Sequence, residues 1–211
     1  MPHFKGKYRI GSARLPSWDY TSSGYYFITI CTLNRACFFG EVIKGEMQLS
    51  RLGEIGQRFW AEIPNHTRNA ALDEYVVMPN HVHGIIIISQ SGVGTPPTSV
   101  ETLRSTPVET LPVETLHATS LPRPPRDPND PMSVISPQAG SLAAMVRSYK
   151  SAVSYWASHN GRPDFGWQAR YHDHIIRDEE NLSQVRQYLR DNPLNWHLDR
   201  ENPVYKAGDA P

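Results

Sequence analysis

The sequence predicts a single domain of the α+β class, with helices packed on an antiparallel sheet. The chain has 211 residues, a length that suits one medium-sized domain. Its apolar residues occur either in short β-branched runs or at three- and four-residue spacing in longer stretches. These segments follow one another in the order strand, helix, two strands, helix, strand, helix. That order is close to a ferredoxin-like or RRM-like arrangement.

The expected strands are short runs rich in β-branched and aromatic residues. Tyr25–Thr32 (YYFITICT) is the first, and Glu41–Leu49 after it is expected to form a hairpin. Glu74–Met78 and His81–Ile88 lie on either side of a Pro-Asn pair, which is typical of turns. The last expected strand is Trp167–Arg177 (WQARYHDHIIR).

Three helices alternate with these strands. They are expected over Arg51–Ile63, Leu142–Trp156 and Glu179–Asp191. Pro64 should end the first helix, and an Asn-Gly pair follows the second. Asp178 is a suitable N-cap for the third. The apolar stripe of this last helix is centred on Leu182, Val185 and Leu189, so one of its sides should pack on the sheet.

Proline is unevenly distributed along the chain. Residues 91–138 hold ten of the 18 prolines, no Phe, Trp or Tyr, and three copies of Val-Glu-Thr-Leu at irregular spacing. Such a segment cannot bury enough apolar surface to offset the entropy lost on ordering. We therefore expect a disordered low-complexity insertion. The expected organisation is a basic arm (residues 1–20), one domain (21–90 and 139–196), the insertion (91–138) and a tail (197–211).

The formal net charge is zero, with 21 basic and 21 acidic residues. This balance argues against a protein that coats long DNA, but it allows a nucleic-acid enzyme with a local basic face. The insertion holds five acids and three bases, so the rest of the chain carries 18 bases and 16 acids. The N-terminus has no apolar signal segment, and the aliphatic run Ile85–Ile88 is too short to cross a bilayer. We expect a protein of the bacterial cytoplasm or nucleoid with no membrane partner.

His81 and His83 are the first candidate functional residues. Alternate side chains on a strand face the same side, so both imidazoles project together while Val82 faces the other way. Two adjacent imidazoles offer two metal ligands on a rigid platform. Taken alone, the spacing also allows a pair of solvated polar side chains. Ile85 stands where a third histidine would be needed, which sets aside the histidine-triad nucleotide hydrolases.

Tyr188 and Asn192 form a second candidate pair at the end of the last predicted helix. They are four residues apart, so they lie on one side of the helix, one turn from each other. They fall on the flank of the apolar stripe, where a side chain reaches along the sheet and still meets solvent. A packed boundary tyrosine and a helix-stopping asparagine before Pro193 explain this pair at least as well when it is taken alone.

Three longer motifs contain these residues. They are YVVMPNHVHGIII, GWQARYHDHIIRDEENL and QYLRDNP. Together they strongly resemble the single-tyrosine HUH transposases, and most of all the REP-associated tyrosine transposases, which are related to insertion-sequence transposases. The opening stretch YYFITICTLNRACFF is also similar to the first strand of that family. The resemblance extends from about Gly24 to Trp196, without the insertion, which compact relatives lack.

The resemblance implies roles for four residues. His81 and His83 would bind a metal ion, Asn192 would supply a third, oxygen ligand, and Tyr188 would be the nucleophile. Two imidazoles and an amide oxygen leave open positions that suit Mg²⁺ or Mn²⁺. Family members cut single-stranded DNA beside a palindromic hairpin and rejoin strands through a 5′-phosphotyrosine. The implied partner is therefore single-stranded or hairpin DNA. Monomers and homodimers both occur in the family, and the sequence does not choose between them.

Further residues are weaker candidates for DNA contacts. They are Lys150, Arg147, Trp167, Arg170, Arg177 and His174. Aromatic and basic side chains on the last predicted strand suit stacking of unpaired bases and contacts to phosphates, although an ordinary amphipathic strand is an equal alternative. His172 and His174 also form a second His-x-His, a rival metal pair.

Two other functions stay open from the sequence. The first is a non-catalytic hairpin-binding protein derived from such a transposase, although all four expected active-site residues are present. The second is a replication-initiator-type HUH nuclease, which shares the chemistry but would need a helicase domain that this chain does not show.

Overall fold

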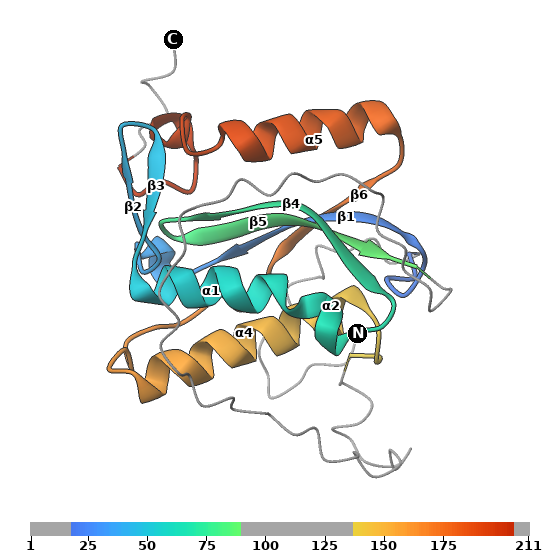
Figure 1. The fold of residues 1–211 in the computed structure, drawn as a ribbon, viewed down its shortest axis with the longest axis horizontal. Helices are drawn as coiled ribbons and strands as arrows, with labels where there is room; N and C mark the ends of the chain where they lie inside the picture. The colour runs from blue at the N-terminus through green and yellow to red at the C-terminus, as the bar shows by residue number, and fades with distance from the viewer. Residues whose placement is uncertain (1–17, 90–136, 205–211) are drawn as a thin grey trace, which may run out of the picture. The chain divides into compact units, whose positions relative to one another are not determined.

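The structure is a computed structural model that describes residues 18–89 and 137–204 (Figure 1). Its strands are β1 (Gly24–Cys31), β2 (Gly40–Ile43), β3 (Glu46–Leu49), β4 (Ala70–Met78), β5 (His81–Ile88) and β6 (His172–Ile176). Its helices are α1 (Arg51–Ala61), α2 (Ile63–His66), α4 (Leu142–His159) and α5 (Glu179–Asp191), with short 3-10 turns at Leu33–Arg35 and Trp196–Leu198.

Four strands form one sheet in the order β4-β5-β1-β6, and β2 and β3 form a separate hairpin. Every pair of neighbours in the larger sheet is antiparallel. β1 and β4 therefore run in the same direction with β5 between them, and α1 lies between them in the chain. This is the ferredoxin-like arrangement of an α+β protein, so the predicted fold class is confirmed.

Helices cover both faces of the sheet. Figure 1 shows α5 on one side of the sheet and α1 with α4 on the other. The core beneath α1 and α4 includes Tyr26, Ile28, Ile30, Trp60, Val82 and Tyr149. A smaller core under α5 is made of Ile85, Ile176, Leu182 and Leu189. Because alternate residues of a strand face opposite sides, His81 and His83 share the α5 side with Ile85.

The hairpin, β5 and α5 agree closely with the sequence prediction. The turn between β2 and β3 places Lys44 and Gly45 at positive φ (53° and 81°), the conformation that a two-residue hairpin turn requires. α5 has the predicted bounds, and the Asp178 side chain caps it by accepting a hydrogen bond from the backbone N–H of Asn181.

Two predictions were wrong in the segment from α1 to β4: the end of the first helix and the start of β4. The first helix ends at Ala61, and Pro64 stands in the first turn of α2, where a missing N–H costs no helical hydrogen bond. β4 begins at Ala70, four residues before the predicted start. An irregularity between Leu72 and Tyr75 interrupts its register, and this irregularity hides the strand's alternating pattern.

The last predicted strand is shorter than expected. Only His172–Ile176 pairs with β1, and Trp167 meets Thr32 in an isolated bridge. β1 ends at Cys31 because the chain then enters a 3-10 turn in which Asn34 has positive φ. The residues before His172 therefore have no continuous partner strand.

Several predictions lie outside the described residues. They concern most of the N-terminal arm, most of the insertion and the end of the tail. Within the described ranges, no helix is long and apolar enough to cross a membrane.

Candidate active site

His81 and His83 stand at the start of β5, opposite Cys31 and Thr29 of β1. His81 is fully buried and His83 is 4% exposed, so neither is the solvated polar residue that the spacing alone allowed. Their ring centroids are 4.2 Å apart. The two imidazoles thus form one buried pair on the α5 side of the sheet.

Only one of the two ring nitrogens of His81 has a hydrogen-bond partner among the described residues. Its Nδ1 lies 2.9 Å from Asn80 Oδ1, whereas its Nε2 is buried and has no hydrogen-bond partner among the described residues. Burial lowers the pKa of His81 to about 3, so the ring is neutral at pH 7. A neutral imidazole with an unpaired nitrogen is the form that binds a metal ion.

His83 connects the sheet to α5. Its Nδ1 lies 2.8 Å from Thr29 Oγ1, and its Nε2 lies 3.2 Å from the hydroxyl oxygen of Tyr188. The ring stacks on Phe27 at a centroid distance of 5.3 Å. Burial, and then the neighbouring His81, keep the pKa of His83 well below its ordinary value.

Tyr188 combines an anchored ring with an accessible surface. The residue is 46% exposed, and its ring meets Phe27 edge-on and tilts against His83. Partial burial and the charge of Asp199 raise the pKa of Tyr188 to about 12, against a smaller lowering by the Asn192 side chain. The phenol therefore stays protonated at neutral pH unless a positive charge is placed beside it.

Asn192 is buried immediately after α5. Its Nδ2 donates to Asp199 Oδ2 over 3.4 Å, while its Oδ1 is buried without a hydrogen-bond partner. A buried polar atom without a partner is costly, and the described residues contain three: Trp60 Nε1, His81 Nε2 and Asn192 Oδ1. The last two belong to side chains that both approach Asp199 Oδ2. A divalent metal ion would give both atoms a partner, so the residues fit the ion that the sequence implies.

Asp199 is a further candidate ligand that the sequence did not reveal. Its Oδ2 lies 3.8 Å from His81 Nε2. Among the described His, Cys, Asp and Glu residues, His81, His83 and Asp199 form the one group of three whose ligand atoms all lie within 4.8 Å. The rival pair His172 and His174 is not part of such a group. Asp199 lies in an irregular segment after Pro193, so no periodicity pointed to it.

Tyr188 and all of the candidate ligands except the fully buried His81 line an open cavity of about 410 Å³. Its lining includes Thr29, His83, His172, Tyr188, Asn192 and Asp199. The tail from Asn195 to Glu201 forms part of the wall. Tyr188, which lines this cavity, is 46% exposed.

The candidate DNA contacts separate into two groups. Lys150 and Trp167 are tied together, because Lys150 Nζ donates to the Gln168 carbonyl and the Trp167 indole donates to the Lys150 carbonyl. Trp167 packs on Phe39 and Tyr149, in the core on the far side of the sheet from α5. Arg147 is exposed on α4.

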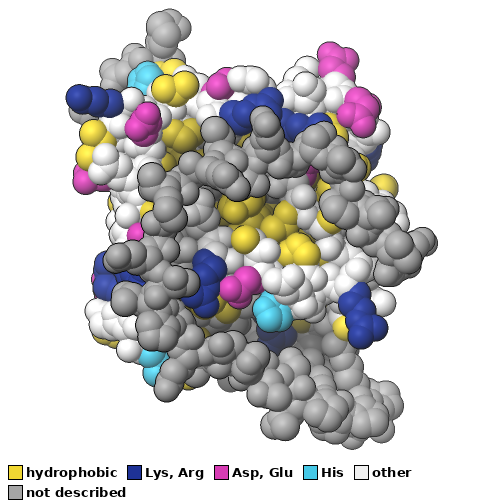
Figure 2. Space-filling view, viewed as in Figure 1, with side chains coloured by type: hydrophobic (Ala, Val, Ile, Leu, Met, Phe, Trp, Pro, Cys, Tyr) yellow, Lys and Arg dark blue, Asp and Glu magenta, His cyan; other side chains and the backbone are white. Residues whose placement is uncertain are grey.

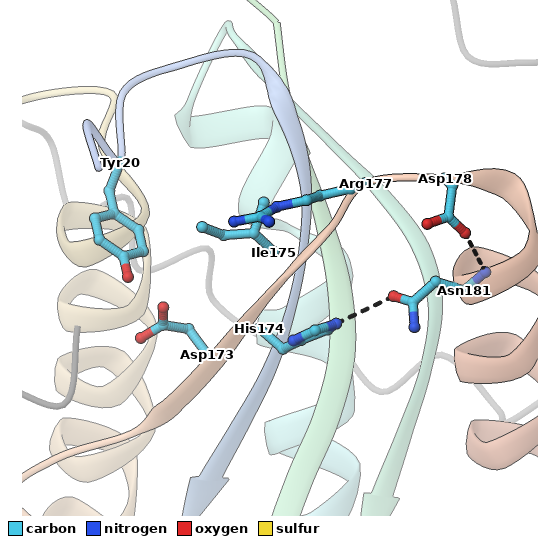
Figure 3. Close-up of a pocket in the computed structure, with 7 residues that line it drawn as sticks. All are labelled: Tyr20, Asp173, His174, Ile175, Arg177, Asp178 and Asn181. Carbon is cyan, nitrogen blue, oxygen red and sulfur yellow. Dashed lines mark hydrogen bonds between the residues drawn. The ribbon is translucent and has the colours of Figure 1, made fainter. Parts of the chain in front are cut away.

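The second group lies near β6 and the start of α5. His174 and Arg177 line a hollow of about 440 Å³ with Tyr20, Asp173, Asp178 and Asn181, shown in Figure 3. His174 Nε2 is 3.1 Å from Asn181 Oδ1. Arg170 is exposed just before this strand. The hollow mixes charges of both signs, so it is not an evident phosphate site.

Arginines also line α5 itself. Figure 2 shows dark-blue basic side chains at the top of the molecule, where α5 lies, and the basic residues of this helix are Arg186 and Arg190. Arg186 donates twice to the Asp73 carboxylate (3.0 and 2.6 Å), and Arg190 pairs with Glu74. These two ion pairs connect α5, the helix that carries Tyr188, to β4 of the same chain.

No family model matches the chain. The fold is shared with a solved REP-associated tyrosine transposase bound to a REP hairpin, with a TM-score of 0.50, 13% identity, and coverage of 89% of this chain and 76% of that chain. The comparison also gives a structure of a candidate transposase from Deinococcus radiodurans R1, with a TM-score of 0.34, 14% identity, and coverage of 85% of this chain and 97% of that chain.

A curated relative gives the family. An uncharacterized protein of Haemophilus influenzae is 35% identical over 189 residues, which are 90% of this chain and 91% of the relative. The chain belongs to the same family as this protein.

Proposed function

We propose that the protein is a metal-dependent endonuclease and strand-transferase that acts on single-stranded DNA beside REP-type palindromic hairpins. The observation that carries this proposal is the contact between the Tyr188 hydroxyl and His83 Nε2 at 3.2 Å, beside two buried ligand atoms without partners. A nucleophile and a ligand set that meet in an open cavity suit phosphoryl transfer.

His81, His83, Asn192 and Asp199 would hold the metal ion. Imidazole, amide and carboxylate ligands suit Mn²⁺ and also Mg²⁺. When bound, such an ion supplies positive charge that draws electrons from the scissile phosphate and lowers the pKa of the nearby phenol.

Tyr188 would carry the covalent step. Its hydroxyl oxygen attacks phosphorus and forms a phosphotyrosine bond at the 5′ side, while the bond from phosphorus to the 3′ oxygen breaks. The 3′ oxygen takes up a proton and leaves as a hydroxyl group, and the phenol gives up its proton. Rejoining reverses these changes with a second 3′-hydroxyl, so the energy of the phosphodiester is kept without ATP.

One chain supplies the nucleophile and the proposed metal ligands. Tyr188 on α5 contacts His83, Asn192 directly after α5 contacts Asp199, and the ion pairs of Arg186 and Arg190 hold α5 there. The proposed reaction therefore needs no second copy. The choice of a REP-type hairpin draws support from the solved neighbour, which is bound to one.

The test is a denaturing gel with a labelled DNA hairpin that has single-stranded flanks, incubated with the protein and Mn²⁺. A protein–DNA adduct that survives denaturation is expected from the wild type and should disappear in Tyr188→Phe. Tyr155→Phe is the matched control, because Tyr155 is an exposed tyrosine on α4. An adduct that persists in Tyr188→Phe would refute the nucleophile, and hairpin binding without any adduct would support the non-catalytic alternative.

A further inference from the structure

Asn80 occupies the turn between β4 and β5, directly before His81, and is fully buried. Its Nδ2 donates to the carbonyl of Arg35 (3.0 Å) and to the carbonyl of Glu201 (2.6 Å). Its Oδ1 lies 2.9 Å from His81 Nδ1. Every polar group of this side chain is therefore engaged, in contrast to His81 Nε2.

The contacts of Asn80 fix which way its amide points. Both partners of Nδ2 are backbone carbonyls, which only accept hydrogen bonds, so the amide nitrogen must face them. The amide oxygen must then face His81. Because this oxygen also only accepts, the hydrogen of the neutral imidazole must be on Nδ1. The lone pair of His81 is left on Nε2, which points toward Asp199.

The backbone of the turn is held as firmly as the side chain. The N–H of Thr32 donates to the Asn80 carbonyl (2.8 Å), and the N–H of Phe39 donates to the Pro79 carbonyl (2.9 Å). The turn is thus joined to the segment that follows β1, and the Asn80 side chain has little freedom to rotate.

Asn80 also holds the tail that carries Asp199. The Glu201 carbonyl is two residues from Asp199, and the backbone N–H of Glu201 donates to Asp199 Oδ1 (2.7 Å). Other contacts also reach the tail here: Arg35, whose side chain is 48% exposed, pairs with Glu201 (2.9 Å) and donates to the Arg200 carbonyl (3.1 Å). The Cys31 thiol also donates to Glu201 Oε2 over a long 3.5 Å. An exposed ion pair contributes little, so the buried bond from Asn80 is the stronger restraint.

We infer that Asn80 is a positioning residue: it fixes His81 in the tautomer whose Nε2 binds a metal ion, and it holds Asp199 beside that nitrogen. This inference rests on the metal site proposed above. Hydrogen bonds from ligand histidines to such neighbours commonly change metal affinity by about 10–100-fold. His83 has no comparable restraint, because the Thr29 hydroxyl both donates and accepts.

The first experiment reads the tautomer in the metal-free protein by long-range ¹H–¹⁵N NMR of the nine histidines, with the His81→Gln variant used for assignment. The wild type should show His81 with its hydrogen on Nδ1. Asn80→Asp keeps an acceptor for that hydrogen and should keep the tautomer, whereas Asn80→Ala should populate the Nε2–H form. A wild-type His81 with its hydrogen on Nε2 would overturn the inference.

The second experiment measures the tail and the metal. Asn80→Asp loses both donors, so hydrogen exchange at the amides of Glu201 and Asn202 should become faster. Mn²⁺ titration should show about 10–100-fold weaker binding in Asn80→Ala. Asn69→Ala is the matched control, because Asn69 donates to a backbone carbonyl at Gly140.

The outcomes separate this inference from the proposed function. If Asn80→Ala does not fold, a changed tautomer or unchanged tail exchange in Asn80→Asp still overturns the inference. Unchanged Mn²⁺ affinity in a folded Asn80→Ala also overturns it. A wild type that binds no Mn²⁺ overturns the proposed metal site, whatever the tautomer of His81.

Discussion

Gly84, the residue after His83, links the candidate site to the core on the other face of the sheet. A Cβ at this position would lie 2.5 Å from Trp60 Cζ2 and 2.8 Å from Tyr75 Cβ, both shorter than real contacts. Trp60 is fully buried, and its ring stands 5.2 Å from Tyr149. Since Trp60 has no room to retreat, Gly84→Ala must displace β5 or its neighbours.

The expected cost follows from this overlap. Inserting atoms into a packed core costs about 1–3 kcal/mol, and the two short contacts place Gly84→Ala at about 2 kcal/mol or above. For a chain of this size each kcal/mol lowers the Tm by about 2–4 °C, so we expect a fall of about 4–8 °C. Adduct formation should fall as well, because a shifted β5 moves His83.

Thermal unfolding followed by circular dichroism measures this effect. Gly24→Ala is the matched control on β1, since a Cβ there would make only ordinary contacts of 3.6 Å or more. Trp60→Phe removes part of the overlapping ring and breaks no hydrogen bond of the indole, which has none in the described structure. The double variant should therefore lose less stability than the sum of the single variants. Unchanged stability in Gly84→Ala would refute this account of the packing.

Three more outcomes follow from the site. Asp199→Asn should weaken Mn²⁺ binding by about tenfold or more, measured by calorimetry, because it removes a charged ligand. Arg186→Gln should lower the free energy of unfolding in urea by about 1–3 kcal/mol, because it leaves the Asp73 carboxylate, which is 6% exposed, without its charged partner. Arg190→Gln removes one partner of an exposed ion pair and should lower the free energy of unfolding by under about 1 kcal/mol. His81 has a folded pKa of about 3, below its unfolded value of about 6.5, so the unfolded state binds more protons between these values. Stability should therefore be full above about pH 7.5 and fall by about 2 kcal/mol by pH 5 from His81 alone, with a further loss from His83, whose pKa is also lowered. His81→Gln should reduce the loss in pH-dependent unfolding.

The strands and helices were largely predictable because their signals are local. β5 and α5 have the expected bounds, since a turn precedes one and an Asp N-cap the other. The start of β4 was missed because Ala70–Asp73 holds no β-branched or aromatic residue, and two acidic residues, Asp73 and Glu74, lie at the register irregularity. Their role lies in ion pairs with α5, which only the tertiary structure creates.

The candidate site was predictable to the extent that spacing and family likeness determine it. Strand alternation placed His81 and His83 on one face, and helical spacing placed Tyr188 near Asn192; the structure brings all four together. Asp199 had no such signal, because it reaches the site only through the path of an irregular tail. The same holds for the contacts of Asn80, whose partners lie 45 and 121 residues away in the chain.

The nucleophile and the metal ligands of the candidate site differ in solvent exposure, and this difference suits the proposed chemistry. The histidines and Asn192 are buried, which leaves few water molecules to compete for a metal ion, whereas Tyr188 is 46% exposed. A nucleophile that must reach a DNA strand cannot be enclosed, whereas the ligands of the proposed metal ion can be buried. Arg186 and Arg190 of α5 are already paired with β4, so contacts to a DNA backbone would depend on other basic side chains, such as the exposed Arg177 after β6. The small basic surplus outside the insertion, 18 bases against 16 acids, thus suits binding to one short segment of DNA next to the tyrosine.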